Sequence, residues 1–227
     1  MIFPPISVQC LPSMNSDSST REEKLDRQID TRSDLLGGSA PTPMVPLGDI
    51  VCFIDGDRGV NYPKKDEFSN SGYCAFLNTR NVTRHGFDFS SVQFITKEKD
   101  ELLRKGRIAL GDIVYTTRGT VGNVGLYQRS VFDSVRINSG MVIIRPDKSR
   151  VDAKYLFHIL TSDLHRGTIS AISSGSSQPQ LPISTLARAP IPLPALSIQK
   201  EISSTLGLLD DKIDLNRQLN DNLPLAA

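Results

Sequence analysis

The chain has 227 residues, a formal net charge of +1, and hydrophobic and charged fractions of 38% and 22%. This length allows one or two domains with a buried core, and the composition is that of a globular protein. Three cysteines without a CxxC pair argue against a disulfide framework or a zinc site, so reduced thiols in a cytoplasmic protein are expected. The sequence has neither a signal peptide pattern nor the roughly 18-residue apolar run of a membrane span.

Residues 1–43 are expected to form an extension that is weakly ordered apart from one short helix. Thr20 can cap that helix, Glu23 completes a capping box, and Gly37 can end it. The helix has a thin apolar stripe of Leu25, Ile29 and Leu36. This stripe fits either a partner-docking helix or a largely disordered segment, and the Pro-containing stretch that follows is a linker.

A compact, β-rich domain is expected over residues 44–194. Short runs rich in Val, Ile, Tyr and Phe predict its strands. Those runs are 47–54, 73–79, 87–96, 111–117, 121–127 and 137–146. Helices are predicted over 97–106 and over 151–169, where apolar residues repeat at helical spacing. The last part, 181–194, is punctuated by prolines and is expected to be extended.

Residues 195–223 are predicted to form a helix, with a short tail at 224–227. Apolar residues and two asparagines recur at the alternating spacing of four and three that is typical of a coiled-coil seam. The seam consists of Ile202, Leu206, Leu209, Ile213, Asn216, Asn220 and Leu223. Seam asparagines cost stability but can set register and partner number. The alternative is an ordinary amphipathic helix on its own domain, and the polar continuation favours pairing with another helix.

Charge is concentrated in one block. Residues 104–150 hold nine basic and three acidic side chains, whereas the other parts of the chain are balanced or slightly acidic. Such a block suits a phosphate-rich partner, although a solvated basic face has the same composition. The block contains the sequence TTRGTVGN at 116–123, which lies between two predicted strands.

The motifs of several enzyme classes are missing. TTRGTVGN has neither the lysine nor the spacing of a phosphate-binding GxxxxGK[ST] loop, and no GxGxxG occurs. There is no GxSxG, HExxH, or NPPY-type methyltransferase motif. The three histidines, His85, His158 and His165, do not form a recognisable catalytic pattern. A non-catalytic protein is therefore expected.

Polar loops rich in Arg, Lys, Asn, Gln and Thr offer the side chains that read bases and hold phosphates in duplex DNA. We name them the first loop (58–65), the second loop (78–85), the third loop (116–123) and the fourth loop (173–180). Candidate DNA-contacting residues are Arg118, Thr117, Asn123, Thr116, Thr120, Arg58, Asn61, Lys64, Lys65, Arg80, Arg84, Gln178 and Gln180. Each loop alone is weak evidence, since polar loops are common. Structural alternatives are an Arg118–Asp112 ion pair and a turn role for Asn123.

Four segments form a familiar pattern: GDIVYTTRGTVGNVGLY, INSGMVIIRP, SGSSQPQLPISTL and IPLPALSIQKEISSTLGLLDDKIDLN. Together they closely resemble the specificity (S) subunits of type I restriction–modification systems, which serve host defence. The last segment is the most specific, because it looks like the join between a target-recognition domain and the family's spacer helix. The resemblance covers residues 44–223 and leaves 1–43 outside.

The resemblance implies an α+β fold: a twisted, mainly antiparallel β-rich target-recognition domain followed by a C-terminal coiled-coil spacer helix. Such subunits usually hold two recognition domains, and each reads one half of a bipartite double-stranded DNA site. Modification (M) subunits bind the helices and methylate adenine with S-adenosylmethionine, while restriction (R) subunits use ATP to translocate and cut DNA. The S subunit itself is expected to bind no cofactor or metal.

This sequence departs from the family pattern because it has one recognition domain, and Pro224 ends its helix early. It is therefore expected to be either a half-subunit, which would pair with a second copy or a second S half, or a truncated product. A symmetric dimer would read a palindromic bipartite site. The alternative function is a protein-interaction or regulatory fragment that binds M subunits without reading DNA.

Overall fold

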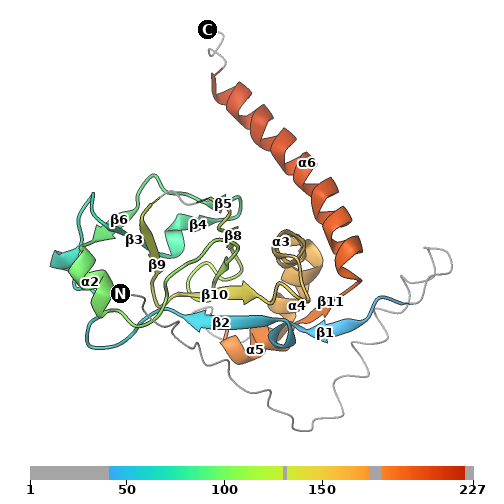
Figure 1. Ribbon diagram of the computed structural model, residues 1–227, viewed down its shortest axis with the longest axis horizontal. Helices are drawn as coiled ribbons and strands as arrows, with labels where there is room; N and C mark the ends of the chain where they lie inside the picture. Colours follow the sequence, from blue (N-terminus) through green and yellow to red (C-terminus); the bar gives the residue numbers. More distant parts are fainter. Residues whose placement is uncertain (1–40, 130–131, 174–179, 223–227) are drawn as a thin grey trace, which may run out of the picture.

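The computed structural model describes residues 41–129, 132–173 and 180–222. Two sheet layers lie side by side, small helices cover the outer face of the larger sheet, and the long helix α6 (Leu196–Asn222) projects from the domain (Figure 1). The predicted fold class is confirmed: the chain is mixed α and β, its sheets are mainly antiparallel, and it ends in a helix. The tail at 224–227 and nearly all of the N-terminal extension lie outside the described residues.

The central sheet has four antiparallel strands in the order β2-β10-β7-β8. Their bounds are Val51–Asp55 for β2, Met141–Pro146 for β10, Ile113–Thr116 for β7 and Val124–Leu126 for β8. Side chains alternate between the two faces of a strand, and both faces of β10 and β7 are buried. Val142 and Ile144 pack toward the helices, whereas Met141 and Ile143 pack toward the second sheet.

The second sheet has three strands in the order β6-β3-β9. These are β6 (Gln93–Ile95), β3 (Cys74–Leu77) and β9 (Ser134–Ile137). The β3–β9 pair is parallel, and β6 is antiparallel to β3. The helix α2 (Lys97–Leu102) follows β6, and a small hairpin of β4 (Val82–Thr83) and β5 (Gly86–Phe87) packs beside β8 of the central sheet. Thr96 caps α2 by accepting a hydrogen bond from Lys99 N at 3.2 Å.

The helix predicted over 151–169 is two helices, α3 (Ala153–Thr161) and α4 (Asp163–Ser173). Ser162 separates them because its backbone is extended and its hydroxyl accepts a hydrogen bond from His165 N at 3.2 Å. The extended prediction for 181–194 was wrong at α5 (Ile183–Ala187). Pro182 precedes that helix, where it cannot interrupt a backbone hydrogen bond, and buried Leu186 anchors it.

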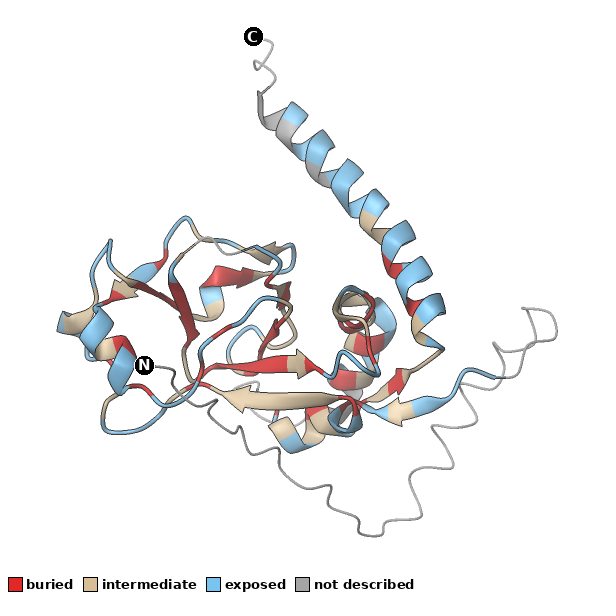
Figure 2. Cartoon of the chain, viewed as in Figure 1, coloured by how far each residue is buried: buried red, intermediate tan, exposed pale blue. Residues whose placement is uncertain are grey.

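The two ends of the domain meet at the foot of α6. Strand β1 (Met44–Pro46) pairs with β11 (Pro190–Pro192), and Leu193 N donates to Pro43 O at 2.8 Å. Gln199 then fixes the helix, because its fully buried amide donates to two backbone carbonyls and accepts from Asp152 N at 2.9 Å. Only the first part of α6 is held this way, and most of the remaining helix surface is exposed (Figure 2).

The predicted seam of α6 remains largely open in this chain. Ile202, Leu209 and Ile213 are exposed by 37%, 53% and 48%, and Asn216 is also exposed. Leu206 is half-buried. Asn220 lies in the helix, but its side chain and all of Leu223 fall outside the described residues. Seam pairing therefore stays a prediction about a partner of this helix.

Candidate nucleic-acid interface

The turn Asn138–Gly140, between β9 and β10, is the point where the polar loops meet. Asn138 N donates to Leu77 O at 2.8 Å, and Asn138 Oδ1 accepts from Gly140 N at 2.9 Å. Gly140 O accepts hydrogen bonds from the backbones of Thr117 and Arg118, at 2.9 and 3.1 Å. The turn thus ties the end of β3 to the third loop, although the two lie far apart in the sequence.

The first loop packs against the same turn. A side chain on Gly56 would place its Cβ 2.2 Å from Asn138 O, so only glycine allows this approach. Arg58 Nη2 donates to Ser139 O at 3.2 Å and pairs with Asp55 at 3.2 Å, while half of its side chain stays exposed. Lys64 and Lys65 are exposed, whereas the Asn61 amide donates to a backbone carbonyl at 3.3 Å.

Asp57 holds the first loop in shape. Its carboxylate accepts from Gly59 N at 2.7 Å and from Arg104 N at 2.8 Å. Burial acts to raise the pKa of Asp57, but the backbone N–H groups of Gly59, Arg104 and Lys105 outweigh it and hold the pKa below its usual value. The loop is therefore fixed by a carboxylate that stays ionised near neutral pH.

The second loop lies beside the turn Asn138–Gly140, where Thr79 approaches Gly140, and beside the third loop, where Asn123 donates to Val82 O. Asn81 is fully buried and braces it, accepting from Asn78 N and donating to Asp88 O, each at 3.0 Å. Arg80 and Arg84 are exposed, which leaves their guanidinium groups available to a ligand. The second loop also contacts α6, because Arg217 Nη2 lies 3.2 Å from His85 Nδ1.

Burial corrects two predicted DNA contacts of the third loop, those of Thr116 and Thr117. Thr116 and Thr117 are 0% and 5% exposed, and their hydroxyls hydrogen-bond to carbonyls of Thr120 and Gly140. Asn123 is half-buried and donates its amide to Val82 O at 2.8 Å, so the structure supports the bracing alternative. These three residues shape the loop, and the hydroxyls of Thr116 and Thr117 are already used within the protein.

Thr120 is exposed, and Arg118, like Asn123, is partly exposed. Arg118 forms an antiparallel bridge with Gln180, which is exposed and belongs to the fourth loop. Gln178 lies outside the described residues. The alternative Arg118–Asp112 ion pair was wrong, because Arg145 Nε and Nη2 hold both carboxylate oxygens of Asp112 at 2.8 Å. Asp112 is buried, and its ion-pair partner is therefore Arg145.

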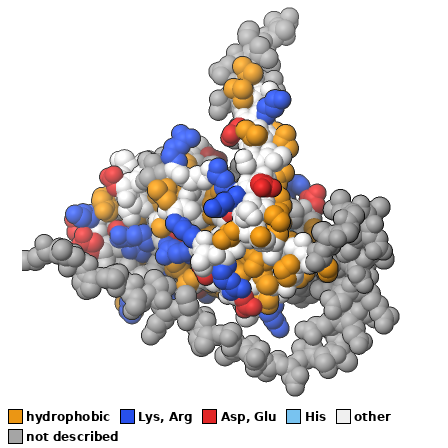
Figure 3. Space-filling view, turned by 45° about the vertical axis from the view of Figure 1, so that its right-hand side comes forward, with side chains coloured by type: hydrophobic (Ala, Val, Ile, Leu, Met, Phe, Trp, Pro, Cys, Tyr) orange, Lys and Arg blue, Asp and Glu red, His pale blue; other side chains and the backbone are white. Residues whose placement is uncertain are grey.

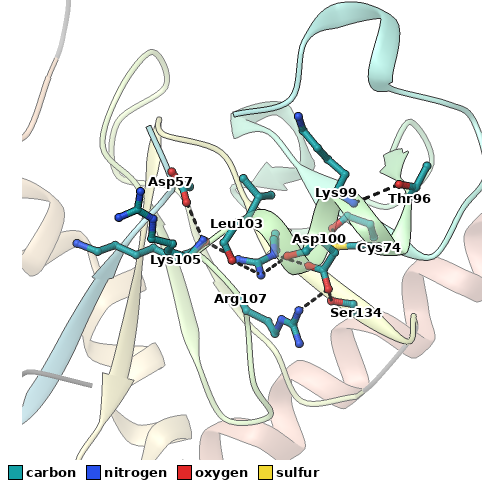
Figure 4. A network of polar contacts seen from close by, with 12 residues as sticks. Asp57, Cys74, Thr96, Lys99, Asp100, Leu103, Lys105, Arg107 and Ser134 are labelled. Carbon is teal, nitrogen blue, oxygen red and sulfur yellow. Dashed lines mark hydrogen bonds and ion pairs between the residues drawn. The ribbon is translucent and has the colours of Figure 1, made fainter. Parts of the chain in front are cut away.

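Sequence reasoning missed a further basic loop, Leu103–Arg107. It adjoins the first loop and the turn, since Asp57 accepts from Arg104 N and Gly106 O accepts from Ile137 N at 2.9 Å. Arg104 and Lys105 are exposed. Lys105 points away from the buried contacts (Figure 4). The basic block that begins at residue 104 is a sequence signal for this loop. The helix predicted over 97–106 hides it, because most of the loop falls within that predicted helix.

A buried ion-pair cluster positions this basic loop (Figure 4). Asp100 is fully buried and accepts from Arg136 Nε, Arg107 Nη2 and Ser134 Oγ. Arg136 uses its remaining N–H groups on the carbonyls of Lys105, Leu103 and Asp100 at 2.6, 2.9 and 2.8 Å. The cluster therefore links α2, β9 and the loop through charge-assisted hydrogen bonds.

The assembled surface is basic and carries no recognisable reactive group among the residues described. Lys and Arg side chains gather on the face of the domain beside α6 (Figure 3). Among the described residues, no group of His, Cys, Asp or Glu is arranged to hold a metal ion. In the same part of the chain, no helix is long and apolar enough to cross a membrane. The arrangement suits binding through cations, amides and hydroxyls.

Comparison with known proteins agrees with this geometry. A family model described as "Type I restriction modification DNA specificity domain" matches residues 43–225. The chain is 30% identical over 202 residues to the type I restriction enzyme MjaIX specificity subunit of Methanocaldococcus jannaschii, covering 88% of this chain and 41% of that protein. It is 24% identical over 177 residues to the HindI specificity subunit of Haemophilus influenzae, covering 76% of this chain and 38% of that protein.

Solved structures show the same fold. The HsdS subunit from Thermoanaerobacter tengcongensis superposes with a TM-score of 0.56 at 17% identity, over 88% of this chain and 48% of that one. A chain from a study of assembly and conformational transition of the type I R-M system gives a TM-score of 0.59 at 16% identity, over 88% of this chain and 47% of that one. The present chain thus spans less than half the length of these relatives.

Proposed function

Because the chain belongs to the family of type I restriction–modification DNA specificity domains, we propose that it reads one half of a bipartite DNA site. The observation that carries this proposal is the convergence of the polar loops on the turn Asn138–Gly140. Loops that lie far apart in the sequence form one basic surface. A rigid scaffold that presents several loops on one side is a common arrangement for binding sites.

Two kinds of contact are proposed within this surface. Arg118 and Gln180 lie together and can offer hydrogen bonds to base edges. Arg80, Arg84 and Lys105 are exposed around them and suit phosphate contacts, which give affinity without sequence information. Thr116, Thr117 and Asn123 act by holding the third loop in place.

The proposed partners bind through α6. M subunits dock on the exposed helix and supply adenine methylation with S-adenosylmethionine, and R subunits join them and use ATP. The specificity chain contributes recognition and holds neither cofactor. The other half-site is assigned to a second copy or a second S half. We propose that a complex with these activities works in the cytoplasm.

DNA binding by the chain mixed with its M subunit tests this proposal. Affinity should fall steeply with salt, because counterions are released when cations meet phosphates. Arg118→Ala should weaken binding at constant helical content, and Ser184→Ala, an exposed site in α5, serves as a control. Sequencing of methylated adenines in cells that express both subunits would then identify the half-site.

The alternative function, a fragment that docks M subunits without reading DNA, predicts a different result. The complex with the M subunit would form, yet no specific DNA binding would be seen even at low salt. That outcome would reject the recognition proposal and leave the docking function of α6 intact.

A further inference from the structure

Val60 is an apolar side chain that projects into solvent from the tip of the first loop. It is 94% exposed, the largest exposed fraction among the large apolar side chains that the structure describes. Single apolar residues are common on protein surfaces, so exposure alone indicates no function. What distinguishes Val60 is its setting, because the loop that carries it is fixed on both sides and is otherwise polar and basic.

A tight turn presents this side chain. Val60 and Asn61 are the two central residues of a β-turn, which is closed by the hydrogen bond that Tyr62 N donates to Gly59 O at 3.0 Å. On the N-terminal side of the turn, Asp57 Oδ1 accepts from Gly59 N at 2.7 Å. The backbone at the tip is therefore held by hydrogen bonds within the loop.

The C-terminal side of the turn is anchored to the second sheet and to α2. Pro63 is buried, and the Tyr62 ring packs edge-on against Phe76, with ring centroids 5.7 Å apart. The Asn61 amide donates to Leu102 O at 3.3 Å. A ligand would thus meet a tip whose conformation is already set, which lowers the ordering cost of binding.

The tip belongs to the surface that we propose to meet DNA. Arg58, two residues before it, donates to Ser139 O within the turn Asn138–Gly140 at 3.2 Å. The first loop contains three basic residues and no acidic one, and its Lys64 and Lys65 are exposed. The apolar tip is therefore flanked by cations that suit phosphate contacts.

The chemistry of duplex DNA offers one match for a small apolar side chain in such a place. In the major groove the apolar group on the base edges is the 5-methyl group of thymine, and short apolar side chains contact it. Side chains that wedge between base steps from the minor groove are mostly longer, such as Phe, Leu, Ile and Met. A protein partner is less well matched, because anchors at protein interfaces are mostly Trp, Tyr and Arg, and valine is under-represented.

We propose that Val60 is a specificity-determining residue that reads a thymine, by packing its methyl groups on the thymine 5-methyl group in the major groove. The inference rests on the proposed function and deepens it, because it assigns one base pair of the half-site to one side chain. The cations around the tip contribute affinity for any sequence, whereas Val60 distinguishes a thymine from a cytosine, which has no methyl group at that position.

Duplexes that contain deoxyuridine test this contact, since deoxyuridine pairs like thymidine and lacks only the 5-methyl group. The full-length chain with its M subunit is titrated with the half-site, in which each thymine is replaced singly. One replacement should weaken binding about fourfold, the value of one buried methyl group, and the others should have no effect. Val60→Ala should bind the thymine and deoxyuridine duplexes equally at that position, so the two changes are not additive.

Two controls accompany the titration. Leu164→Ala removes a side chain of α4 that is 73% exposed and should keep the fourfold difference. Urea unfolding should show unchanged stability for Val60→Ala, because its side chain is exposed in the folded protein. Val60→Ile keeps a branched apolar tip and should retain the preference for thymine.

The outcomes separate this inference from the proposed function. Specific DNA binding that is insensitive to every deoxyuridine replacement, or a difference that persists in Val60→Ala, would overturn the thymine contact and leave the recognition function standing. Weaker binding of the M subunit by Val60→Ala, with DNA affinity and thymine preference unchanged, would make the tip a protein contact instead. Absence of any specific DNA binding would reject the proposed function, and the thymine contact with it.

Discussion

The buried carboxylate Asp100 gives the sharpest prediction about how the basic loop is supported. Replacing it with Asn keeps the size of the side chain but removes the charge that pairs with Arg136 and Arg107. Arg136 is 3% exposed, so its cation would remain buried without an anionic partner. Removing one member of such a pair typically costs about 3–5 kcal/mol, a large part of the roughly 5–15 kcal/mol that stabilises a domain.

Urea unfolding monitored by circular dichroism measures this loss. Asp100→Asn should lower the free energy of unfolding by at least about 3 kcal/mol. Arg58→Ala is the matched control, because its ion pair with Asp55 is about half exposed on the arginine side and contributes less than about 1 kcal/mol. A loss below about 1 kcal/mol for Asp100→Asn would refute the reasoning, since it would mean that Arg136 does not need the carboxylate.

Three further predictions concern the loops, acid stability and α6. Gly56→Ala should destabilise the protein by about 1–3 kcal/mol because its Cβ would strike Asn138, whereas Gly167→Ala in α4 meets nothing within 4 Å and should be neutral or stabilising in the same urea assay. Burial, aided by Arg166, lowers the pKa of His165 to about 4 in the folded protein. The unfolded chain therefore binds a proton at His165 more readily than the folded protein does. The stability that neutral His165 contributes is complete above about pH 6.5 and is lost as pH falls from about 6.5 to about 4. A pH series of melting temperatures should show this loss for the native chain and a smaller one for His165→Phe. Gln199→Ala should cost about 1–3 kcal/mol, measured by urea unfolding, by leaving Asp152 N unpaired at the foot of α6.

Local patterns in the sequence were sufficient for much of the fold. Strand predictions near 113–116 and 141–146 succeeded because β-branched and aromatic residues occur there in short runs between turn residues. The predicted C-terminal helix agrees with α6, whose apolar spacing is regular. Helical prediction failed at Ser162, where a hydroxyl caps a new helix in the middle of an apparently continuous pattern, and it ran past the end of α2, which stops at Leu102 and not at Gly106.

The candidate interface was predicted less completely, since polar residues give no local sign of whether they face solvent. Thr116 and Thr117 have the composition of a DNA-contacting loop, yet their hydroxyls are used inside the protein. Lys105 was overlooked because it reaches the interface only through the contacts of Arg136 and Asp57 with distant backbone groups. No property of the isolated segment specifies those contacts.

The sequence by itself determined the class of protein, the β-rich domain, the projecting helix and the set of candidate polar loops. Only the tertiary structure decided which loop residues face outward, that Asp112 belongs to Arg145, and that the loops surround Asn138–Gly140. The physical reason is range: strand and helix signals come from neighbouring residues, whereas exposure and pairing depend on hydrogen bonds between groups that are far apart along the chain.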